Sequence, residues 1–352
     1  MRVLWIGKAC EDAAAGNEIY DRRMIAALRD HGFEIDVISP QPVSPARELA
    51  NLARGIPHYR ARYGSSANRA LLAVAARYPI AVCSWEPFDM LAHALACPVI
   101  PILHNITSRS LRSMYPTNPV AKLLAMRAAQ WERDAYGGGR FAATVVLSRA
   151  DEAYVCSIAP AARIIYAPPG LPPVTPLSPN ARFVPEMVIA GTFDWRAKRR
   201  DILRLASEWQ AGGLNLKVVS DPLPETAAAK FRATSRSLSD NAAAIRIGVV
   251  PDRFEAGHKL KVGAYIANNA MVLSFADPGT EYRGIEDAGY FIRQIQAVDD
   301  IRTVASELAA VDPEQLRRRW LAFQVRVQHQ FCWHNSMTAI ASALVEVAGK
   351  HP

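Results

Sequence analysis

One glycine and two lysines near the start of an expected helix are the residues best suited to bind an anion. Gly257, Lys259 and Lys261 lie in the segment PDRFEAGHKLKVGAYIANNAMVLS, residues 251–274. Glycine lets the backbone approach a ligand closely, and the unpaired amides of a helix N-terminus favour negative charge. The segment therefore predicts a phosphate site. The alternative is a solvated helix face that happens to carry lysines.

The apolar residues that follow the lysines predict the elements that position them. Leu260, Val262, Tyr265 and Ile266 recur at the spacing of an α-helix, and residues 271–273 form the short apolar run of a buried strand. The lysines then lie where a loop passes into a helix, which is where α/β sheets bind ligands.

Strand-like and helical patterns alternate along the whole chain, which predicts an α/β fold with mostly parallel sheets. Strands are expected at residues 3–6, 34–39, 80–83, 99–103, 144–147, 163–166, 187–190, 216–220, 245–250, 271–273 and 290–292. The main helices are expected at residues 17–30, 120–136, 198–209, 260–267, 301–308 and 313–348, with Asn17 as the cap of the first.

The length of 352 residues exceeds what one hydrophobic core usually supports, so two domains are expected. The segment 167–185 carries seven prolines and little hydrophobic periodicity, which is typical of a linker. We expect a first domain over residues 1–168, a linker over 169–185 and a second domain over 186–352. Their sheets would face an interdomain cleft, and the last helix is allowed to pack back on the first domain.

Net charge, cysteine content and the length of apolar runs argue against several classes of protein. The net charge of +8 favours anionic partners, but the basic clusters lack the interleaved aromatic residues of a nucleic-acid platform, so nucleic acid is not expected. Five scattered cysteines predict neither a disulfide framework nor a zinc site. No apolar run reaches the roughly 18 residues of a membrane span, and the N-terminus is typical of a first strand rather than a signal peptide. We expect a cytoplasmic protein.

Several segments, taken in order, resemble the GT-B glycosyltransferases, most closely the retaining family 4 group. In the first half these are 15–17 (AGN), 103–110 (LHNITSRS), Glu132, 145–155 (VVLSRADEAYV) and 168–170 (PPG). In the second half they are 188–202 (VIAGTFDWRAKRRDI), 251–262 (PDRFEAGHKLKV) and 331–336 (FCWHNS). Their order and spacing carry the resemblance, which spans nearly the whole chain.

The resemblance implies two Rossmann-like domains and a helical C-terminus. It also implies transfer of a sugar from a nucleotide diphosphate sugar to an acceptor hydroxyl, with retention of configuration and without metal. The second domain would bind the donor, a UDP- or GDP-sugar, and the first a carbohydrate or lipid-linked acceptor. No cofactor is expected beyond this co-substrate. Polysaccharide or glycolipid synthesis is the setting it suggests. Apart from the resemblance, the basic segment 109–122 is expected to touch an anionic membrane at the inner face, through the interspersed apolar residues Leu111, Met114, Tyr115, Leu123 and Leu124.

The resemblance also implies roles for particular residues. It assigns five residues of the second half to the donor diphosphate, namely Arg196, Lys198, Gly257, Lys259 and Lys261. His104 would be catalytic beside the donor sugar, and Gly16 and Asn17 would approach donor phosphate or acceptor. Several of these residues also have a structural alternative. Arg196 would belong to a charged surface turn, His104 would be a structural hydrogen-bonding residue, and Gly16 and Asn17 would form a simple helix cap. Apart from the resemblance, Glu11 and Asp12 in the loop after the first strand are candidates to hold or deprotonate an acceptor hydroxyl.

One departure from the family affects the donor site. Ala256 and Ala264 stand where the family carries two glutamates, and Asn269 replaces the usual glycine before the strand. Glu281 is a candidate replacement for the missing carboxylate. The departure keeps two alternatives open: a binding protein that retains the GT-B shell without activity, and a nucleotide-sugar epimerase of the same architecture.

Overall fold

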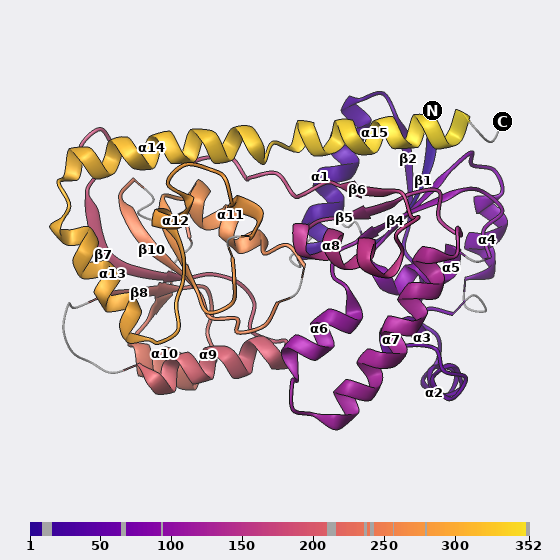
Figure 1. The fold of residues 1–352 in the computed structure, drawn as a ribbon, viewed down its shortest axis with the longest axis horizontal. Helices are drawn as coiled ribbons and strands as arrows, with labels where there is room; N and C mark the ends of the chain where they lie inside the picture. The colour runs from indigo at the N-terminus through magenta and orange to yellow at the C-terminus, as the bar shows by residue number, and fades with distance from the viewer. Residues whose placement is uncertain are drawn as a thin grey trace. The chain divides into compact units, whose positions relative to one another are not determined.

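The computed structural model describes residues 1–8, 16–64, 68–92, 94–209, 216–235, 238–239, 243–255, 257–278 and 280–349. The chain divides into two compact units (Figure 1). Unit 1 comprises Met1–Pro169, Ala256–His258 and Trp333–Pro352, and unit 2 comprises Gly170–Glu255 and Lys259–Cys332. The chain thus passes from one unit to the other at the start of the proline-rich segment, and its C-terminal helix belongs to unit 1.

Unit 1 contains a six-stranded sheet in the order β2-β1-β3-β4-β5-β6, with every pair parallel. The strands are β1 (Arg2–Ile6), β2 (Glu34–Ile38), β3 (Ala81–Ser84), β4 (Val99–Leu103), β5 (Thr144–Val146) and β6 (Ile164–Tyr166). The central strands β3 and β4 are buried along their whole length, as expected for parallel strands covered on both faces.

Helices cover both faces of this sheet. They are α1 (Gly16–Asp30), α2 (Pro45–Ala53), α3 (His58–Ala61), α4 (Arg69–Ala75), η2 (Glu86–Phe88), α5 (Asp89–Ala92), α6 (Thr107–Met114), α7 (Pro119–Gly137), α8 (Arg149–Ile158) and α15 (Trp333–Gly349). The last of these, α15, packs beside α1, and Met337, Ile340 and Leu344 join one hydrophobic core with Tyr20 and Met24. The C-terminal helix therefore closes a core begun by the first helix.

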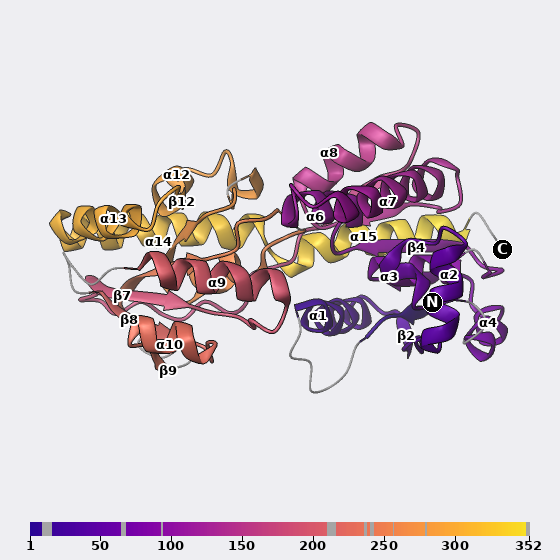
Figure 2. The same cartoon turned by 90° about the horizontal axis from the view of Figure 1, so that it is seen from below.

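Unit 2 contains a second six-stranded parallel sheet, in the order β12-β11-β10-β7-β8-β9. Its strands are β7 (Phe183–Ile189), β8 (Lys217–Ser220), β9 (Thr234–Ser235), β10 (Ile245–Val250), β11 (Ala270–Ser274) and β12 (Ile292–Gln294). Its helices are α9 (Arg196–Glu208), α10 (Glu225–Phe231), α11 (Leu260–Ala267), η3 (Thr280–Tyr282), α12 (Ala288–Phe291), α13 (Asp299–Ala310) and α14 (Pro313–Gln330). Helices α10 and α14 lie on opposite sides of the sheet (Figure 2).

The predicted α/β fold with parallel sheets is confirmed, and several local predictions differ from the structure. Residues 290–291 are the end of α12, so β12 begins only at Ile292. The single C-terminal helix is broken between α14 and α15. Helix α6 was not predicted. Helix α1 begins at Gly16, so Asn17 lies inside the helix rather than at its cap.

Asn269 shows why the usual glycine before β11 is replaceable. Its φ is +56°, in the left-handed region that asparagine tolerates better than other side chains. Its Oδ1 accepts hydrogen bonds from Trp320 Nε1 and Gln324 Nε2 of α14, each at 2.9 Å, and its Nδ2 donates to Thr175 O at 2.9 Å. One side chain thus ties the turn before β11 to the longest helix of unit 2.

We predict that Asn269→Ala lowers the free energy of unfolding by about 3 kcal/mol, because buried hydrogen bonds are lost and alanine is strained at positive φ. Asn269→Gly should lower the free energy of unfolding by about 1 kcal/mol less than Asn269→Ala does, because glycine accepts this φ. Asn268→Ala is the matched control, since Asn268 has a φ of −108°. Urea denaturation checks the order, and equal losses for the alanine and glycine variants would contradict it.

Candidate functional site

His104 lies in a buried polar group at the carboxyl ends of three strands of unit 1. It follows β4, Ser84 ends β3, and Asp21 comes from α1, which follows β1. Ser84 Oγ donates to Asp21 Oδ1 and lies 2.9 Å from His104 Nε2, while that nitrogen lies 3.7 Å from Asp21 Oδ1. Ser84 therefore connects the carboxylate to the imidazole.

Burial shifts the pKa of both ionisable groups towards the neutral form. It lowers the pKa of His104 to about 3 and raises that of Asp21 to about 6. Tyr20 packs the edge of its ring against the imidazole, with 5.0 Å between ring centroids. Gly7, after β1, makes room for the carboxylate, since a Cβ there would lie 2.5 Å from Asp21 Oδ2. At neutral pH the imidazole is uncharged.

The backbone beside this group is strained. Trp85, directly after β3, has a φ of +93°, which is unusual for a bulky residue and is typical of functional sites. Glu86 is buried, accepts a hydrogen bond from the amide of Asn105, and has its pKa raised to about 8 by burial. Sequence reasoning missed Ser84, Asp21 and Glu86 because no local pattern marks them.

Gly257 belongs to unit 1 and lies against the same loop. Its φ is +52°, and a Cβ would fall 1.9 Å from the carbonyl oxygen of His104 and 2.7 Å from Asn105 Oδ1. No side chain fits there. The glycine that the sequence assigned to a phosphate loop is therefore required by a close contact between two backbone segments.

Other candidates of unit 1 are placed as follows. Glu132 is buried in α7 and accepts hydrogen bonds from the amide and hydroxyl of Ser108, which makes it a structural residue that holds α6 to α7. Gly16 and Asn17 form the start of α1. Glu11 and Asp12 lie outside the described residues.

In unit 2, three lysines surround one buried carboxylate. Asp252 follows β10 and is 4% exposed. Lys261 Nζ lies 3.1 Å from its Oδ2. Burial alone would raise the pKa of Asp252, but Lys261, Lys259 and Lys198 together lower it below its ordinary value. Asp252, Lys198, Lys259 and Lys261 are called the lysine cluster below. Three lysines act electrostatically on Asp252, and Glu255 and Asp201 also act on Lys259, more weakly than Asp252 does. Within the four residues of the cluster, positive charge therefore exceeds negative charge.

The three lysines differ in the groups that surround their ammonium charges. Lys259, at the cap of α11, donates to Phe254 O at 3.0 Å, and burial lowers its pKa to about 8. Burial, followed by the repulsion of Lys261, also lowers the pKa of Lys198 in the first turn of α9. Gly191, beside Lys261, has a φ of +121°, which glycine accepts readily. Bound negative charge would offset the repulsion among the lysines.

The remaining candidates of unit 2 surround the same loops. Arg196 is exposed at the first position of α9. Ala264 lies half-buried in α11, and Ala256 lies outside the described residues. Glu281 lies half-buried in η3. The structure thus brings Lys198, Lys259 and Lys261 together around Asp252, a residue that sequence reasoning did not single out.

Solved structures of glycosyltransferases resemble this chain along its whole length. Sucrose-phosphate synthase from Thermosynechococcus elongatus matches at 16% identity over 99% of both chains, with a TM-score of 0.68. The UDP-forming α,α-trehalose-phosphate synthase from Burkholderia vietnamiensis matches at 11% identity over 99% of this chain and 97% of its own, with a TM-score of 0.62. HepE of Anabaena, solved with UDP and glucose, matches at 13% identity over 98% and 100%, with a TM-score of 0.62. The chain has the GT-B fold.

No known family profile and no curated protein sequence matches the chain. The identities above are too low to carry over function, so the likeness establishes the GT-B fold alone. Within that fold, the lysine cluster and the Asp21–Ser84–His104 group each lie at the carboxyl ends of parallel strands, the usual location of ligand sites in α/β sheets.

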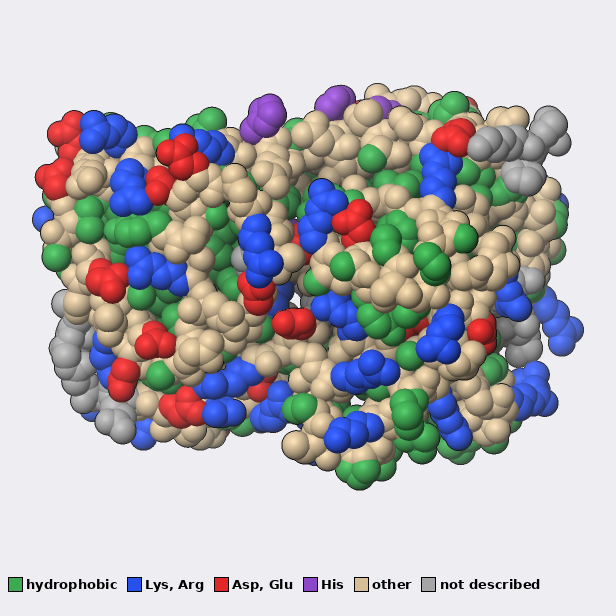
Figure 3. All heavy atoms as spheres, viewed as in Figure 1, with side chains coloured by type: hydrophobic (Ala, Val, Ile, Leu, Met, Phe, Trp, Pro, Cys, Tyr) green, Lys and Arg blue, Asp and Glu red, His purple; other side chains and the backbone are tan. Residues whose placement is uncertain are grey.

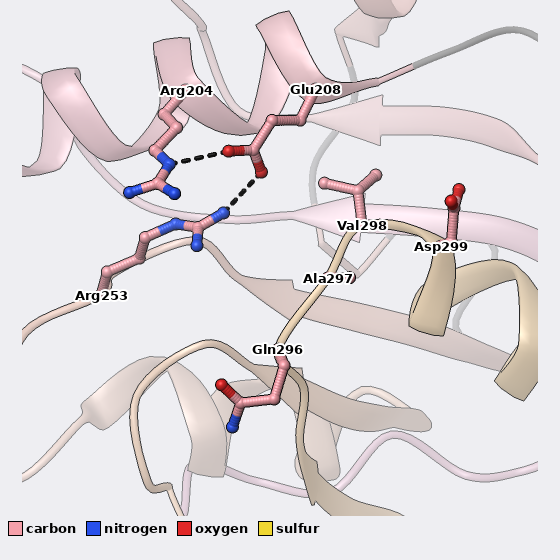
Figure 4. A pocket seen from close by; sticks show the side chains of 7 residues that line it. All are labelled: Arg204, Glu208, Arg253, Gln296, Ala297, Val298 and Asp299. Atoms are coloured by element: carbon pink, nitrogen blue, oxygen red, sulfur yellow. Dashed lines mark hydrogen bonds and ion pairs between the residues drawn. The ribbon is translucent and has the colours of Figure 1, made fainter.

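A hollow of this GT-B chain also lies in unit 2 (Figure 4). It has a volume of about 310 Å³ and is lined by Arg204, Glu208, Arg253, Gln296, Ala297, Val298 and Asp299. Glu208 binds both arginines, with 2.7 Å to Arg204 Nε and 2.7 Å to an Arg253 terminal nitrogen. Since Asp299 also lines the hollow, two carboxylates accompany the two arginines, and the hollow is less suited to an anion than the lysine cluster.

We predict that binding of a nucleoside diphosphate, which is fully ionised at pH 8, takes up about half a proton at that pH, because Lys259 is half ionised there and the anion raises its pKa. Calorimetry in buffers of different ionisation enthalpy measures the uptake. Lys259→Met should abolish it. Uptake that persists in this variant would show that another group titrates.

Proposed function

We propose that this chain is a glycosyltransferase that moves a sugar from a nucleotide diphosphate sugar to an acceptor hydroxyl. The lysine cluster is the observation that carries the proposal. Its excess positive charge at the carboxyl end of β10 suits a diphosphate, and the GT-B fold supports a nucleotide-sugar donor. We assign donor binding to unit 2 and acceptor binding to unit 1.

The lysine cluster accounts for leaving-group stabilisation. Negative charge develops on the diphosphate as the glycosidic bond breaks, and fixed cations lower the energy of that state. Lys259 and Lys261 are held in place by a carbonyl and a carboxylate respectively, so little reorganisation accompanies the reaction. With cations in this role, we propose a metal-independent reaction.

The reaction we propose retains the configuration of the donor sugar. The departing diphosphate takes the acceptor proton on the same face, so no side-chain base is needed. We propose that His104, uncharged at neutral pH, acts as a hydrogen-bonding group for a sugar hydroxyl. Polysaccharide or glycolipid synthesis is the setting we propose, with a carbohydrate or lipid-linked acceptor.

Turnover separates this proposal from an inactive GT-B-like binding protein, which the alanine at position 264 favours. A panel of UDP- and GDP-sugars is titrated by calorimetry, and release of nucleotide diphosphate is followed with sugar acceptors. Binding with turnover supports the enzyme. Binding without turnover establishes the alternative, and no affinity for any such donor refutes both. Proton NMR of the product anomer tests retention.

We predict that Lys259→Met and Lys261→Met each weaken binding of the nucleotide diphosphate by roughly 10- to 100-fold, the loss of one charge-assisted hydrogen bond. Binding of the free nucleoside should change little. Lys230→Met on α10 is the matched control, because Lys230 is an exposed lysine of the same unit. Equal losses for the control and the cluster variants would contradict the assignment.

We also propose a peripheral membrane contact, at a surface that differs from the expected one. Leu111 and Met114, expected to touch lipid, are buried at 6% and 1% exposure. Leu123, also expected to touch lipid, is exposed at 48%. Val120 and Met126 of the same helix α7 are exposed at 64% and 56%. Hydrophobic side chains lie among lysines and arginines over this part of unit 1 (Figure 3).

The charge around this stripe favours an anionic surface. Lys122 and Arg127 are exposed on the same helix, and an apolar stripe flanked by cations is typical of interfacial helices. No helix in the described part of the chain is long and apolar enough to cross a bilayer. A contact at the surface is therefore the mode of attachment we propose.

We predict that serine at positions 120, 123 and 126 together abolishes flotation with vesicles containing anionic lipid. Wild-type binding should weaken with salt, since screening reduces the contribution of Lys122 and Arg127. Leu49→Ser is the control, because Leu49 is 67% exposed on α2, away from this helix in the sequence. Wild-type protein that never floats with such vesicles refutes the membrane contact.

A further inference from the structure

The hydroxyl of Ser84 has one proton, and the group to which it donates that proton determines which nitrogen of His104 carries hydrogen. Ser84 Oγ donates that proton to the buried carboxylate of Asp21. The same oxygen lies 2.9 Å from His104 Nε2. Because Ser84 already donates its one proton to Asp21, this oxygen can only accept a hydrogen bond from the imidazole. His104 Nε2 must then carry hydrogen, which leaves Nδ1 as the acceptor of the neutral ring.

We propose that Asp21 and Ser84 are positioning residues that hold His104 as the Nε2–H tautomer and so present Nδ1 as a hydrogen-bond acceptor. The proposal deepens the proposed function and rests on it for its role in the reaction. A ring fixed in this way accepts a hydrogen bond from a sugar hydroxyl without first exchanging its proton. A ring free to change tautomer would offer the acceptor only part of the time.

Burial of Asp21 and Ser84, together with the contact of Tyr20 on one side of the imidazole, supports a single arrangement. Asp21 and Ser84 are 1% and 0% exposed, so water does not compete with their hydrogen bond. Asp21 Oδ2 also accepts from the amide of Lys8 at 3.3 Å, which orients the carboxylate. Tyr20 holds the imidazole from the α1 side and itself packs against Trp333 of α15 at 5.7 Å between centroids.

The charge environment keeps the chain of hydrogen bonds intact near neutral pH. The pKa of His104, lowered to about 3, keeps the ring neutral, so its tautomer is the variable that matters. Asp21, with a pKa of about 6, is ionised above that pH. Glu18 on α1 raises the pKa of Asp21 in addition to burial, while Ser84, the Trp5 side chain of β1 and the Lys8 amide lower it.

Protonation of Asp21 reverses the order of donors. A carboxyl that carries hydrogen can donate to Ser84, which then donates to His104 Nε2, and hydrogen moves to Nδ1. The acceptor is then lost. We expect kcat to fall as the pH drops through about 6, with less effect on KM for the donor.

Nitrogen chemical shifts of the His104 ring in the full-length protein test the proposal without a ligand. At pH 8 the wild type should show a protonated Nε2 and an unprotonated Nδ1, and the assignment should change with a midpoint near pH 6. Ser84→Ala should average the two nitrogens, because Nε2 lies 3.7 Å from Asp21. Asp21→Asn should remove the change near pH 6.

Kinetics supply the second measurement. Ser84→Ala should lower kcat about ten-fold, comparable to the loss of one hydrogen bond, while Ser39→Ala should not. Ser39 is the matched control because it follows β2 at the same edge of the sheet and its hydroxyl donates only to the Gly7 carbonyl, at 2.9 Å. A pH profile that keeps its acid limb in Asp21→Asn would assign that limb to another group.

The outcomes are distinguishable. A wild-type ring that is averaged or protonated at Nδ1 at pH 8 overturns the proposal, and this result needs no variant that folds. A Ser84→Ala ring identical to the wild type also overturns it. Either result leaves donor binding by the lysine cluster untouched, whereas a protein that binds no nucleotide sugar refutes the proposed function while the tautomer still stands.

Discussion

Parallel pairing is the constraint on which both candidate sites depend. All strands within each sheet run the same way, so their carboxyl ends meet at one edge and every crossover helix begins there. Residues far apart in sequence, such as Gly7, Ser84 and His104, are thereby brought to one edge of unit 1. The loops after β7 and β10 likewise bring Lys198 and Asp252 together in unit 2.

Buried charge is tolerated at these edges only where it is compensated. Arg60 and Asp89 are fully buried, form hydrogen bonds through two pairs of atoms at 2.9 and 2.8 Å, and share Tyr136 as a further partner. Such a pair offsets its desolvation cost through geometry and additional hydrogen bonds. The lysine cluster has one carboxylate for three lysines, and this difference is the basis on which we propose that the cluster binds an anion.

The fold was predictable because its signal is local, and much of the site was not. Apolar runs and helical periodicity gave the order of elements, and lysines at a helix start indicated an anion site. Asp21 and Ser84 carry no such signal, because their role arises from contacts across the sheet. The break between α14 and α15 was missed because residues 313–348 keep a helical pattern. The expectation that Leu111 and Met114 face lipid failed because basic neighbours do not reveal which helix face is buried.

Residues at positive φ show a further limit of prediction from the sequence. Gly257 was singled out for its freedom near a ligand, yet the structure assigns that freedom to an approach of 1.9 Å between a hypothetical Cβ and a carbonyl oxygen. Asn269 occupies the left-handed conformation that the family gives to glycine, and it adds hydrogen bonds that glycine lacks. A residue type therefore predicts which conformations are available, whereas the contacts determine why one is used. The same holds for Ser84. Its hydroxyl is able to donate its proton to either Asp21 or His104, and the buried carboxylate of Asp21 determines that it donates to Asp21.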